Sequence, residues 1–260
     1  MAFSSIVASS MASSPRPSGL RRTVSWRRTA GSPRSPGVRR TGNTKHVVAL
    51  VDRSWWPMLG AAIDAVQAIF LDACRREDKL GLATTAGEWV FRPTTKGGRE
   101  RLITAKIQAA NEPGCGIALD ASIGMCMRKL VGSGRDGDVS KWLVVFSDMH
   151  GGDVDGEASA RARQDLESNG VNLIFVNLRN VSRFFPDGDA HWGVLQQNVD
   201  AYLEAAGDRG CELLLEEEDD GVDDEAQRSL NLKEHFMKRL TEAVPFHFSE
   251  LVNLSHEAQL

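Results

Sequence analysis

The chain has 260 residues, of which 42% are hydrophobic and 25% are charged, as in ordinary globular proteins. This length leaves room for one large domain and a tail. No run of about 18 apolar residues occurs, so we expect no membrane-spanning segment. The four cysteines form no CxxC pair, and their spacing fits neither a zinc site nor a small disulfide scaffold. We therefore expect free thiols and an intracellular, reducing location.

The net charge of −4 is unevenly distributed. The segment before Asp52 holds eight arginines, Lys45 and no acidic residue, so it carries about +9 and leaves about −13 for the rest. An acidic folded part argues against nucleic-acid binding by the domain, because contacts to phosphates need clustered Lys and Arg.

Residues 1–45 are rich in Ser, Arg, Pro and Gly. Such a segment cannot bury enough apolar surface to offset the entropy of ordering, so we predict a disordered basic tail. Two interpretations of this tail remain open. It is either a transit peptide, which would direct the protein to a chloroplast or another organelle, or a basic arm that stays on a cytoplasmic protein.

From His46 onward, short apolar runs alternate with segments of helical periodicity. The predicted strands are residues 46–52, 80–86, 88–91, 141–148, 171–178 and 211–217. The predicted helices are residues 58–74, 98–110, 116–131, 156–170, 191–207 and 226–244. This alternation predicts a three-layer, Rossmann-like α/β sandwich, in which helices cover both faces of a mostly parallel sheet.

Polar residues follow the predicted strands where ligands of such sheets gather, at the carboxyl ends. Asp52 and Ser54 follow the first strand, and Asp148 closes the strand at 141–148. Between them, a glycine-flanked turn at Cys115 leads into a helix. We expect these three loops to converge. Two carboxylates and a hydroxyl are hard oxygen donors, which suit Mg²⁺ better than zinc.

The order strand–Asp-x-Ser–helix, turn–helix, strand–Asp resembles the von Willebrand factor A domain of integrins, copines and magnesium chelatase. The resemblance covers about residues 46–245 and leaves residues 246–260 as a C-terminal tail. It implies a sheet with one antiparallel edge strand and a protein-protein interaction module without enzymatic activity. In that family a metal ion is held by Asp, Ser, Ser, Thr and Asp, and a carboxylate of the partner completes its coordination.

Three of the five metal-site positions match this pattern, namely Asp52, Ser54 and Asp148. Trp56 stands in the place of the second Ser, and Cys115 stands in the place of the Thr. Trp offers no oxygen, and a neutral thiol is a poor ligand for so hard an ion. The resemblance therefore implies a degenerate metal site that binds Mg²⁺ weakly or has lost it.

Four residues beside these positions are predicted to form the rim that meets a protein partner: Trp55, Trp56, Cys115 and His150. Tryptophan is enriched at the energetic centres of interfaces. Other roles, some of them purely structural, remain open for the same residues. A Trp side chain could fill the vacated metal position, Cys115 is either a reactive thiol or a buried one, and His150 is either a ligand or a surface residue.

Alternative functions share the same residues. One is a metal-free scaffold domain that binds through a different face. Another is a Mg²⁺-dependent phosphatase of the haloacid-dehalogenase type, but that chemistry needs a second Asp where this chain has Ser54. A phospho-receiver domain would need an acidic pair near the first strand.

Overall fold

The computed structural model describes most of the chain from residue 44 onward. The described residues are 24–27, 44–54, 58–114, 118–132, 139–147, 152–153, 155–177, 192–215 and 225–257. Side chains are left undescribed at 24–27, 192–195, 214–215, 225–233, 236, 239 and 253–257. Within these ranges, no helix has the length and apolar character needed to cross a membrane.

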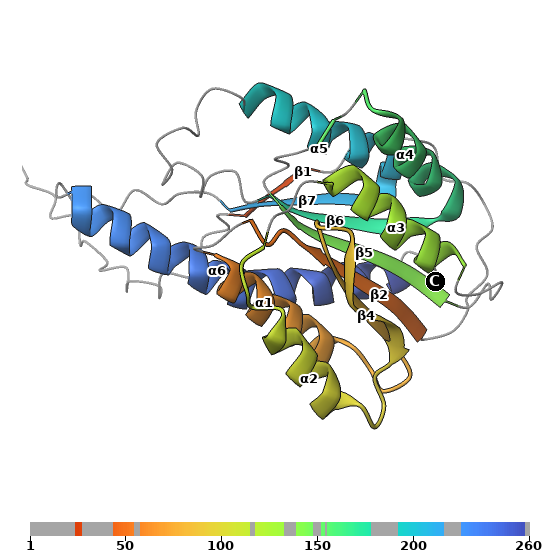
Figure 1. Ribbon diagram of the computed structural model, residues 1–260, viewed down its shortest axis with the longest axis horizontal. Helices are drawn as coiled ribbons and strands as arrows, with labels where there is room; N and C mark the ends of the chain where they lie inside the picture. Colours follow the sequence, from red (N-terminus) through yellow and green to blue (C-terminus); the bar gives the residue numbers. More distant parts are fainter. Residues whose placement is uncertain are drawn as a thin grey trace, which may run out of the picture.

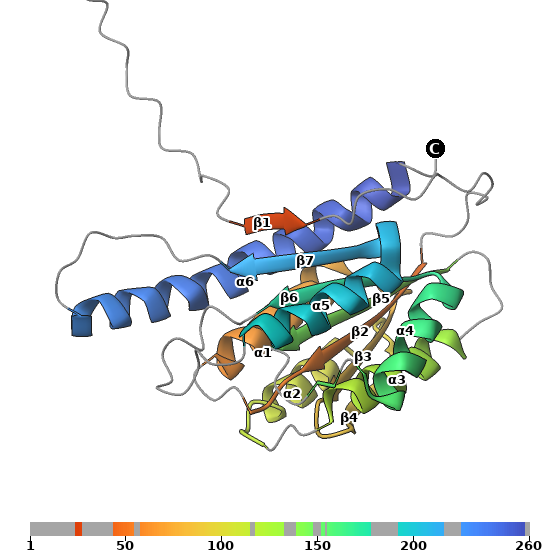
Figure 2. The ribbon, with the colours of Figure 1, turned by 90° about the horizontal axis from the view of Figure 1, so that it is seen from above.

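A seven-stranded sheet in the order β1-β7-β6-β5-β2-β3-β4 forms the middle layer of the described chain (Figure 1). The strands are β1 (Val24–Arg27), β2 (Thr44–Val51), β3 (Lys79–Thr84), β4 (Glu88–Thr95), β5 (Val139–Ser147), β6 (Val171–Asn177) and β7 (Gly210–Leu215). The five inner strands are parallel, and the edge strands β4 and β1 are antiparallel to their neighbours. We predicted only one antiparallel edge strand. Figure 2 shows β1 beside β7, at the opposite edge from β4.

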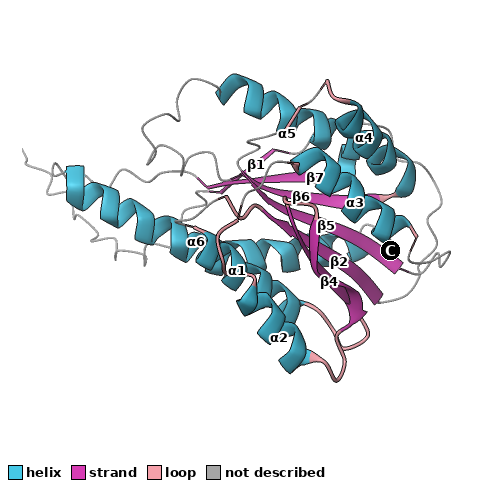
Figure 3. Ribbon diagram, in the orientation of Figure 1, coloured by secondary structure: helices cyan, strands magenta, loops and turns pink. Residues whose placement is uncertain are grey.

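Helices cover both faces of this sheet, which confirms the predicted three-layer, Rossmann-like α/β sandwich (Figures 1 and 3). One face carries α1 (Leu59–Ala68), α2 (Glu100–Ala109) and α6 (Glu225–Glu257). The other carries α3 (Leu119–Val131), α4 (Glu157–Asn169) and α5 (Trp192–Ala206). Each face has its own hydrophobic cluster.

The central strand β2 is apolar on both sides because it contributes to both clusters. Val47, Ala49 and Val51 pack on the face of α1 and α6. Val48 and Leu50 pack on the face of α3. A strand buried on both faces has an unbroken apolar run rather than an alternating one, which is why residues 46–52 were recognisable from the sequence.

The end of the domain lies further along the chain than we predicted. Helix α6 continues through Pro245 to Glu257, so the prediction of a tail is wrong for residues 246–257. Phe248 is fully buried and meets Trp142 edge-on, with ring centroids 5.6 Å apart. Val252 is buried in the same cluster. The burial of this amphipathic face outweighs the helix-breaking tendency of Pro245.

The predicted tail at residues 1–45 also contains structured segments. Val24–Arg27 forms β1 against β7, and Thr44 and Lys45 begin β2. The Lys45 Nζ lies 3.1 Å from the Asp78 Oδ2, and both side chains are buried. The Lys45 backbone N–H donates to the other Asp78 oxygen at 2.7 Å. Val24–Arg27, Thr44 and Lys45 therefore belong to the sheet, and the remainder of residues 1–45 lies outside the described residues.

The two phenylalanines of α6 test whether residues 246–257 belong to the core. Phe248→Ala should lower the free energy of unfolding by about 3–5 kcal/mol, because it leaves a cavity against Trp142. Phe246 is 59% exposed, so Phe246→Ala should change the free energy of unfolding by less than about 0.5 kcal/mol. Urea denaturation of both variants measures the difference. Equal stabilities would show that the end of α6 does not stabilise the domain.

Candidate functional site

The carboxyl ends of β2, β3 and β5 lie level with one another. Val51 pairs in parallel register with the residues just before Thr85 and Ser147. Asp52 follows Val51, so its carboxylate lies between the ends of the two neighbouring strands. Asp52, Thr85 and Ser147 therefore lie at the same edge of the sheet.

The Asp52 carboxylate accepts four hydrogen bonds from protein donors. Its Oδ1 accepts from the Ser54 backbone N–H at 3.0 Å, the Ser54 hydroxyl at 2.7 Å and the Thr85 hydroxyl at 3.1 Å. Its Oδ2 accepts from the Ser147 hydroxyl at 3.2 Å. Asp52 is only 2% exposed, and a buried carboxylate is costly unless such bonds replace its hydration. Three of these donors share Oδ1 and one reaches Oδ2, so each carboxylate oxygen accepts at least one hydrogen bond.

Arg53 fastens the loop after β2 to the loop between α2 and α3. Its Nε donates to the Glu112 carbonyl at 2.6 Å, and its Nη2 reaches the Pro113 carbonyl at 3.5 Å. In return, the Gly114 N–H donates to the Arg53 carbonyl at 3.1 Å. A Cβ at Gly114 would lie 3.2 Å from the Arg53 Cζ, so the close approach of the two loops favours glycine there.

Thr85 also connects β3 to the start of α3. Its carbonyl accepts from the Ala118 N–H at 3.2 Å and from the Ser122 hydroxyl at 3.1 Å. Thr85 is 1% exposed, and Ser122 is fully buried. The same residue therefore supports the Asp52 carboxylate through its side chain and the first turn of α3 through its backbone.

A second buried carboxylate, Asp120 in the first turn of α3, holds the loop after β5. Its Oδ2 accepts from the Asp153 N–H at 2.6 Å, and its Oδ1 accepts from the Tyr202 hydroxyl at 2.6 Å. Burial, and secondarily the bond to Asp120, raises the pKa of the Tyr202 phenol above its usual range, so this donor stays protonated. The Asn198 amide adds a bond to the Gly152 carbonyl at 3.2 Å.

These bonds unite four loops into one surface, which we call the loop platform and define as residues 52–54, 85, 111–114, 118–122 and 152–153. Of the predicted site residues, Asp52 and Ser54 belong to it and lie together. The other five predicted site residues lie outside the described residues: Trp55, Trp56, Cys115, Asp148 and His150. Their described chain neighbours Ser54, Gly114 and Ser147 lie at this edge of the sheet.

Sequence reasoning missed the residues that bind the two buried carboxylates. Thr85 and Ser147 carried one usable signal, since each is a hydroxyl residue at the end of an apolar run. Asp120 and Tyr202 carried none, because they lie 82 residues apart on two separate helices.

Of the predicted metal ligands, the structure describes only Asp52 and Ser54, which are too few to make an octahedral Mg²⁺ site by themselves. Mg²⁺ requires six oxygen ligands in near-ideal geometry. Both Asp52 oxygens accept hydrogen bonds from the protein, one of them from the Ser54 hydroxyl. Among the residues whose placement is described, no three His, Cys, Asp or Glu side chains gather as metal ligands. A metal bound directly by an Asp52 oxygen would compete with the hydrogen bonds that this oxygen accepts.

A scan against protein-family models finds no match to this chain, and a search of curated proteins finds none. Similar solved structures include an aerotolerance-related membrane protein of Bacteroides fragilis, at 16% identity and TM-score 0.37 over 51% of this chain and 66% of that one. A von Willebrand factor type A protein of Catenulispora acidiphila is similar at 13% identity and TM-score 0.44, over 77% of this chain and 43% of that one.

The manganese-loaded TRAP protein of Plasmodium vivax is similar at 12% identity and TM-score 0.39, over 64% of this chain and 74% of that one. This chain spans less than two thirds of the length of the Bacteroides and Catenulispora proteins. At such low identity and with TM-scores below 0.5, these likenesses say nothing about what this chain binds.

The hydroxyl of Thr85 should contribute measurably to stability. Thr85→Val keeps the side-chain volume and leaves the buried Asp52 carboxylate short of a donor, so the free energy of unfolding should fall by about 1–3 kcal/mol. Thr104→Val is the control, since that hydroxyl bonds only to the Glu100 carbonyl of its own helix and should cost less than about 0.5 kcal/mol. Thermal and urea unfolding compare the two. Equal losses would contradict a special role for Thr85.

The described cysteines should be inert in the folded chain. Burial, and secondarily Asp78, raises the pKa of Cys74 from 9.0 to about 12, and burial raises that of Cys126 above its usual range. Cys211 is also buried. Since only thiolates react, the Cys115→Ser variant should react with Ellman's reagent at about pH 8 only as fast as it unfolds. A rapidly reacting thiol in this variant would contradict the described burial.

Proposed function

We propose that this chain is a protein-recognition module that uses the loop platform and needs no metal ion to keep the platform in shape. The observation that carries the proposal is the Asp52 carboxylate, which four protein donors satisfy. These bonds hold the carboxylate in place without a metal ion. This one is 2% exposed and bonds three loops to one another.

The rigidity of the platform supports a role in binding. Each of its loops is fixed by side-chain bonds to a neighbouring loop, as Arg53 shows for the carbonyls of Glu112 and Pro113. A surface that is already ordered loses little conformational entropy when a partner binds. Loops on a rigid α/β scaffold are also the usual position of binding residues.

Trp55 and Trp56 are our candidates for the anchors of the interface. The chain leaves the platform at the exposed residue Ser54 and returns at the buried residue Met58. The two tryptophans lie between these points in the sequence. Trp provides a large contact area and a single N–H donor, which suits an apolar pocket on the partner. Cys115 and His150 would lie on the same rim.

This mechanism differs from metal-mediated adhesion in what it requires of the partner. A metal bound by Asp52, Ser54 and Asp148 would need an acidic side chain from the partner to complete its coordination. The metal-free platform instead needs an apolar recess for Trp55 or Trp56. The described geometry does not favour the phosphatase alternative, because both oxygens of Asp52 are engaged and Ser54 supplies no general acid.

Partner capture with and without EDTA tests this proposal. The full chain, immobilised and exposed to an extract of its source cells, should retain the same proteins in EDTA as in Mg²⁺. Trp55→Ala/Trp56→Ala should reduce their recovery at least about tenfold, because it removes the proposed anchors. Phe246→Ala, which removes an exposed aromatic ring on α6 that is not part of the platform, should leave recovery unchanged.

Calorimetry separates the metal-free mechanism from the metal-assisted one. Titration of Mg²⁺ or Mn²⁺ into the full chain should give no saturable heat. Saturable heat that is lost in Asp148→Ala, together with EDTA-sensitive capture, would overturn metal independence. Unchanged capture by the double tryptophan variant would overturn the proposed rim.

A further inference from the structure

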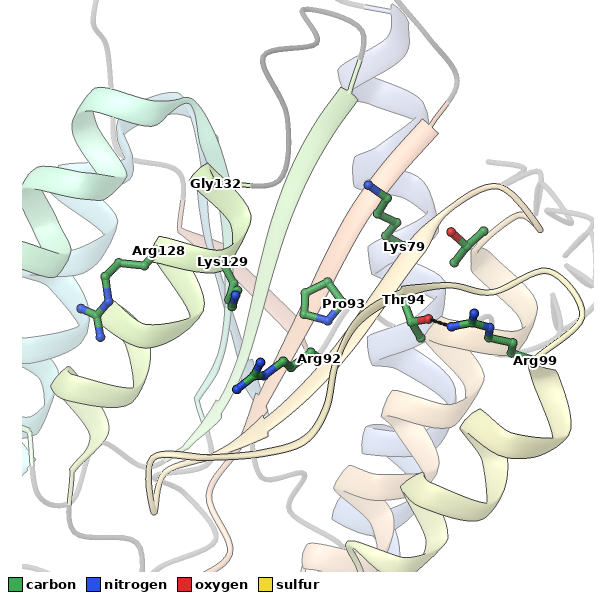
Figure 4. Close-up of a pocket in the computed structure, with 9 residues that line it drawn as sticks. Lys79, Arg92, Pro93, Thr94, Arg99, Arg128, Lys129 and Gly132 are labelled. Atoms are coloured by element: carbon green, nitrogen blue, oxygen red, sulfur yellow. Dashed lines mark hydrogen bonds between the residues drawn. The ribbon is translucent and has the colours of Figure 1, made fainter.

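A basic pocket lies at the end of the sheet opposite the loop platform. It has a volume of about 470 Å³, and its lining includes the cationic side chains of Lys79, Arg92, Arg99, Arg128 and Lys129 (Figure 4). Strand β3 begins at this end, and β4 and α3 finish here. Because α3 starts at the platform, its length separates the two sites.

The pocket concentrates positive charge in an otherwise acidic domain. Among the described residues, its lining contains no Asp or Glu. None of its five cationic side chains forms an ion pair with a carboxylate among the residues that the structure places. Protein surfaces usually intersperse charges of both signs, and like charges gathered in a hollow raise the local concentration of counter-ions. The unneutralised cations therefore favour an anionic ligand.

A bulge in the edge strand shapes the pocket. The pairing of β3 with β4 shifts register between Leu80 and Leu82, at Gly81. Pro93 packs directly over this glycine, where an added Cβ would lie 3.0 Å from the Pro93 Cγ. Proline has no backbone N–H, and an edge strand tolerates it where that N–H would face away from the sheet. Bulges change the direction of neighbouring side chains. The Gly81 and Pro93 pair thus fixes how the side chains on either side of Pro93 leave β4.

The cations divide between the two walls of the pocket (Figure 4). Arg92 extends from β4 toward α3, and Lys129 extends from α3 toward β4, whereas Arg128 turns away from β4. On the other side of β4, Arg99 donates a hydrogen bond to the Thr94 hydroxyl. Arg92 and Lys129 are therefore the pair best placed to hold one ligand between strand and helix.

We propose that this pocket binds a small anion that carries several phosphoryl groups. The planar fork of arginine and the compact charge of lysine are the two side chains that proteins use for phosphates. Cations on separate elements suit several linked phosphoryl groups better than one. The pocket has the size of a small-molecule site, typically about 300–1,000 Å³. Its lining holds no aromatic ring on which a nucleotide base could stack.

Calorimetric titration of inorganic tripolyphosphate into the full chain, at about 0.15 M salt, tests this inference. Binding to the pocket should be saturable with one ligand per chain. Arg92→Gln/Lys129→Gln should raise Kd by about tenfold, since each cation of this exposed pair contributes a few-fold to the affinity. Arg161→Gln/Lys238→Gln removes the same charge from exposed positions on α4 and α6, so its Kd should stay within about twofold.

Two comparisons keep the outcome unambiguous. The arginine-rich residues 1–43 are present in every variant, so unchanged affinity in Arg92→Gln/Lys129→Gln would place binding on that segment and overturn the proposal. If Kd rose equally in both double variants, the loss of affinity would come from net charge alone, and this result would also overturn the proposal. Arg92→Lys/Lys129→Arg keeps both charges and should retain binding of tripolyphosphate. Thermal unfolding of all variants, which should coincide with that of the original chain, checks that each variant is folded.

The source of the ligand is distinguished by two further probes. Inositol hexakisphosphate represents a free compound, and vesicles that contain phosphatidylinositol 4,5-bisphosphate represent a lipid headgroup. Binding of either probe that requires Arg92 and Lys129 supports the pocket and identifies the source. Failure of tripolyphosphate and of both probes would overturn the inference and leave the loop platform unaffected, because the two sites lie at opposite ends of the sheet.

Discussion

The buried carboxylate of Asp52 is the interaction on which the carboxyl edge of this domain depends. It is 2% exposed and takes its hydrogen bonds from the loop after β2 and from the ends of β3 and β5. A carboxylate removed from water without partners would oppose folding by several kcal/mol. The native register, in which Thr85 and Ser147 lie level with Asp52, supplies these partners. The strand pairing and the functional edge are therefore stabilised together.

The other loops are ordered in relation to this centre. Thr85 bonds to Asp52 through its hydroxyl and receives the start of α3 at its carbonyl. Asp120, in the first turn of the same helix, then fixes Asp153 and Tyr202. Buried polar networks of this kind rigidify a protein when every member has a partner. The result is a surface whose shape depends on internal hydrogen bonds, which is the physical basis for binding without a metal.

The two ends of the sheet differ in charge. The carboxyl edge is built on buried carboxylates and hydroxyls, while the amino-terminal end carries the buried Lys45–Asp78 ion pair and the basic pocket. Helix α3 contributes to both ends, through Asp120 in its first turn and Lys129 in its last. Acidic residues at a helix N-terminus and basic residues at its C-terminus both interact favourably with the helix dipole. The acidic and basic ends of α3 are thus the ones that its dipole stabilises.

The sequence by itself determined the fold class and the positions of Asp52 and Ser54, because strand and helix periodicities are local and a polar residue after a buried strand must lie at its carboxyl end. Only the tertiary structure decided what surrounds Asp52. Thr85 and Ser147 lie 33 and 95 residues away in the chain, and Tyr202 lies 82 residues from Asp120. Strand order and register create these contacts, and no local pattern encodes them. For the same reason, α6 continues through Pro245 because its buried face packs on the sheet, and the basic pocket forms where β3, β4 and α3 meet.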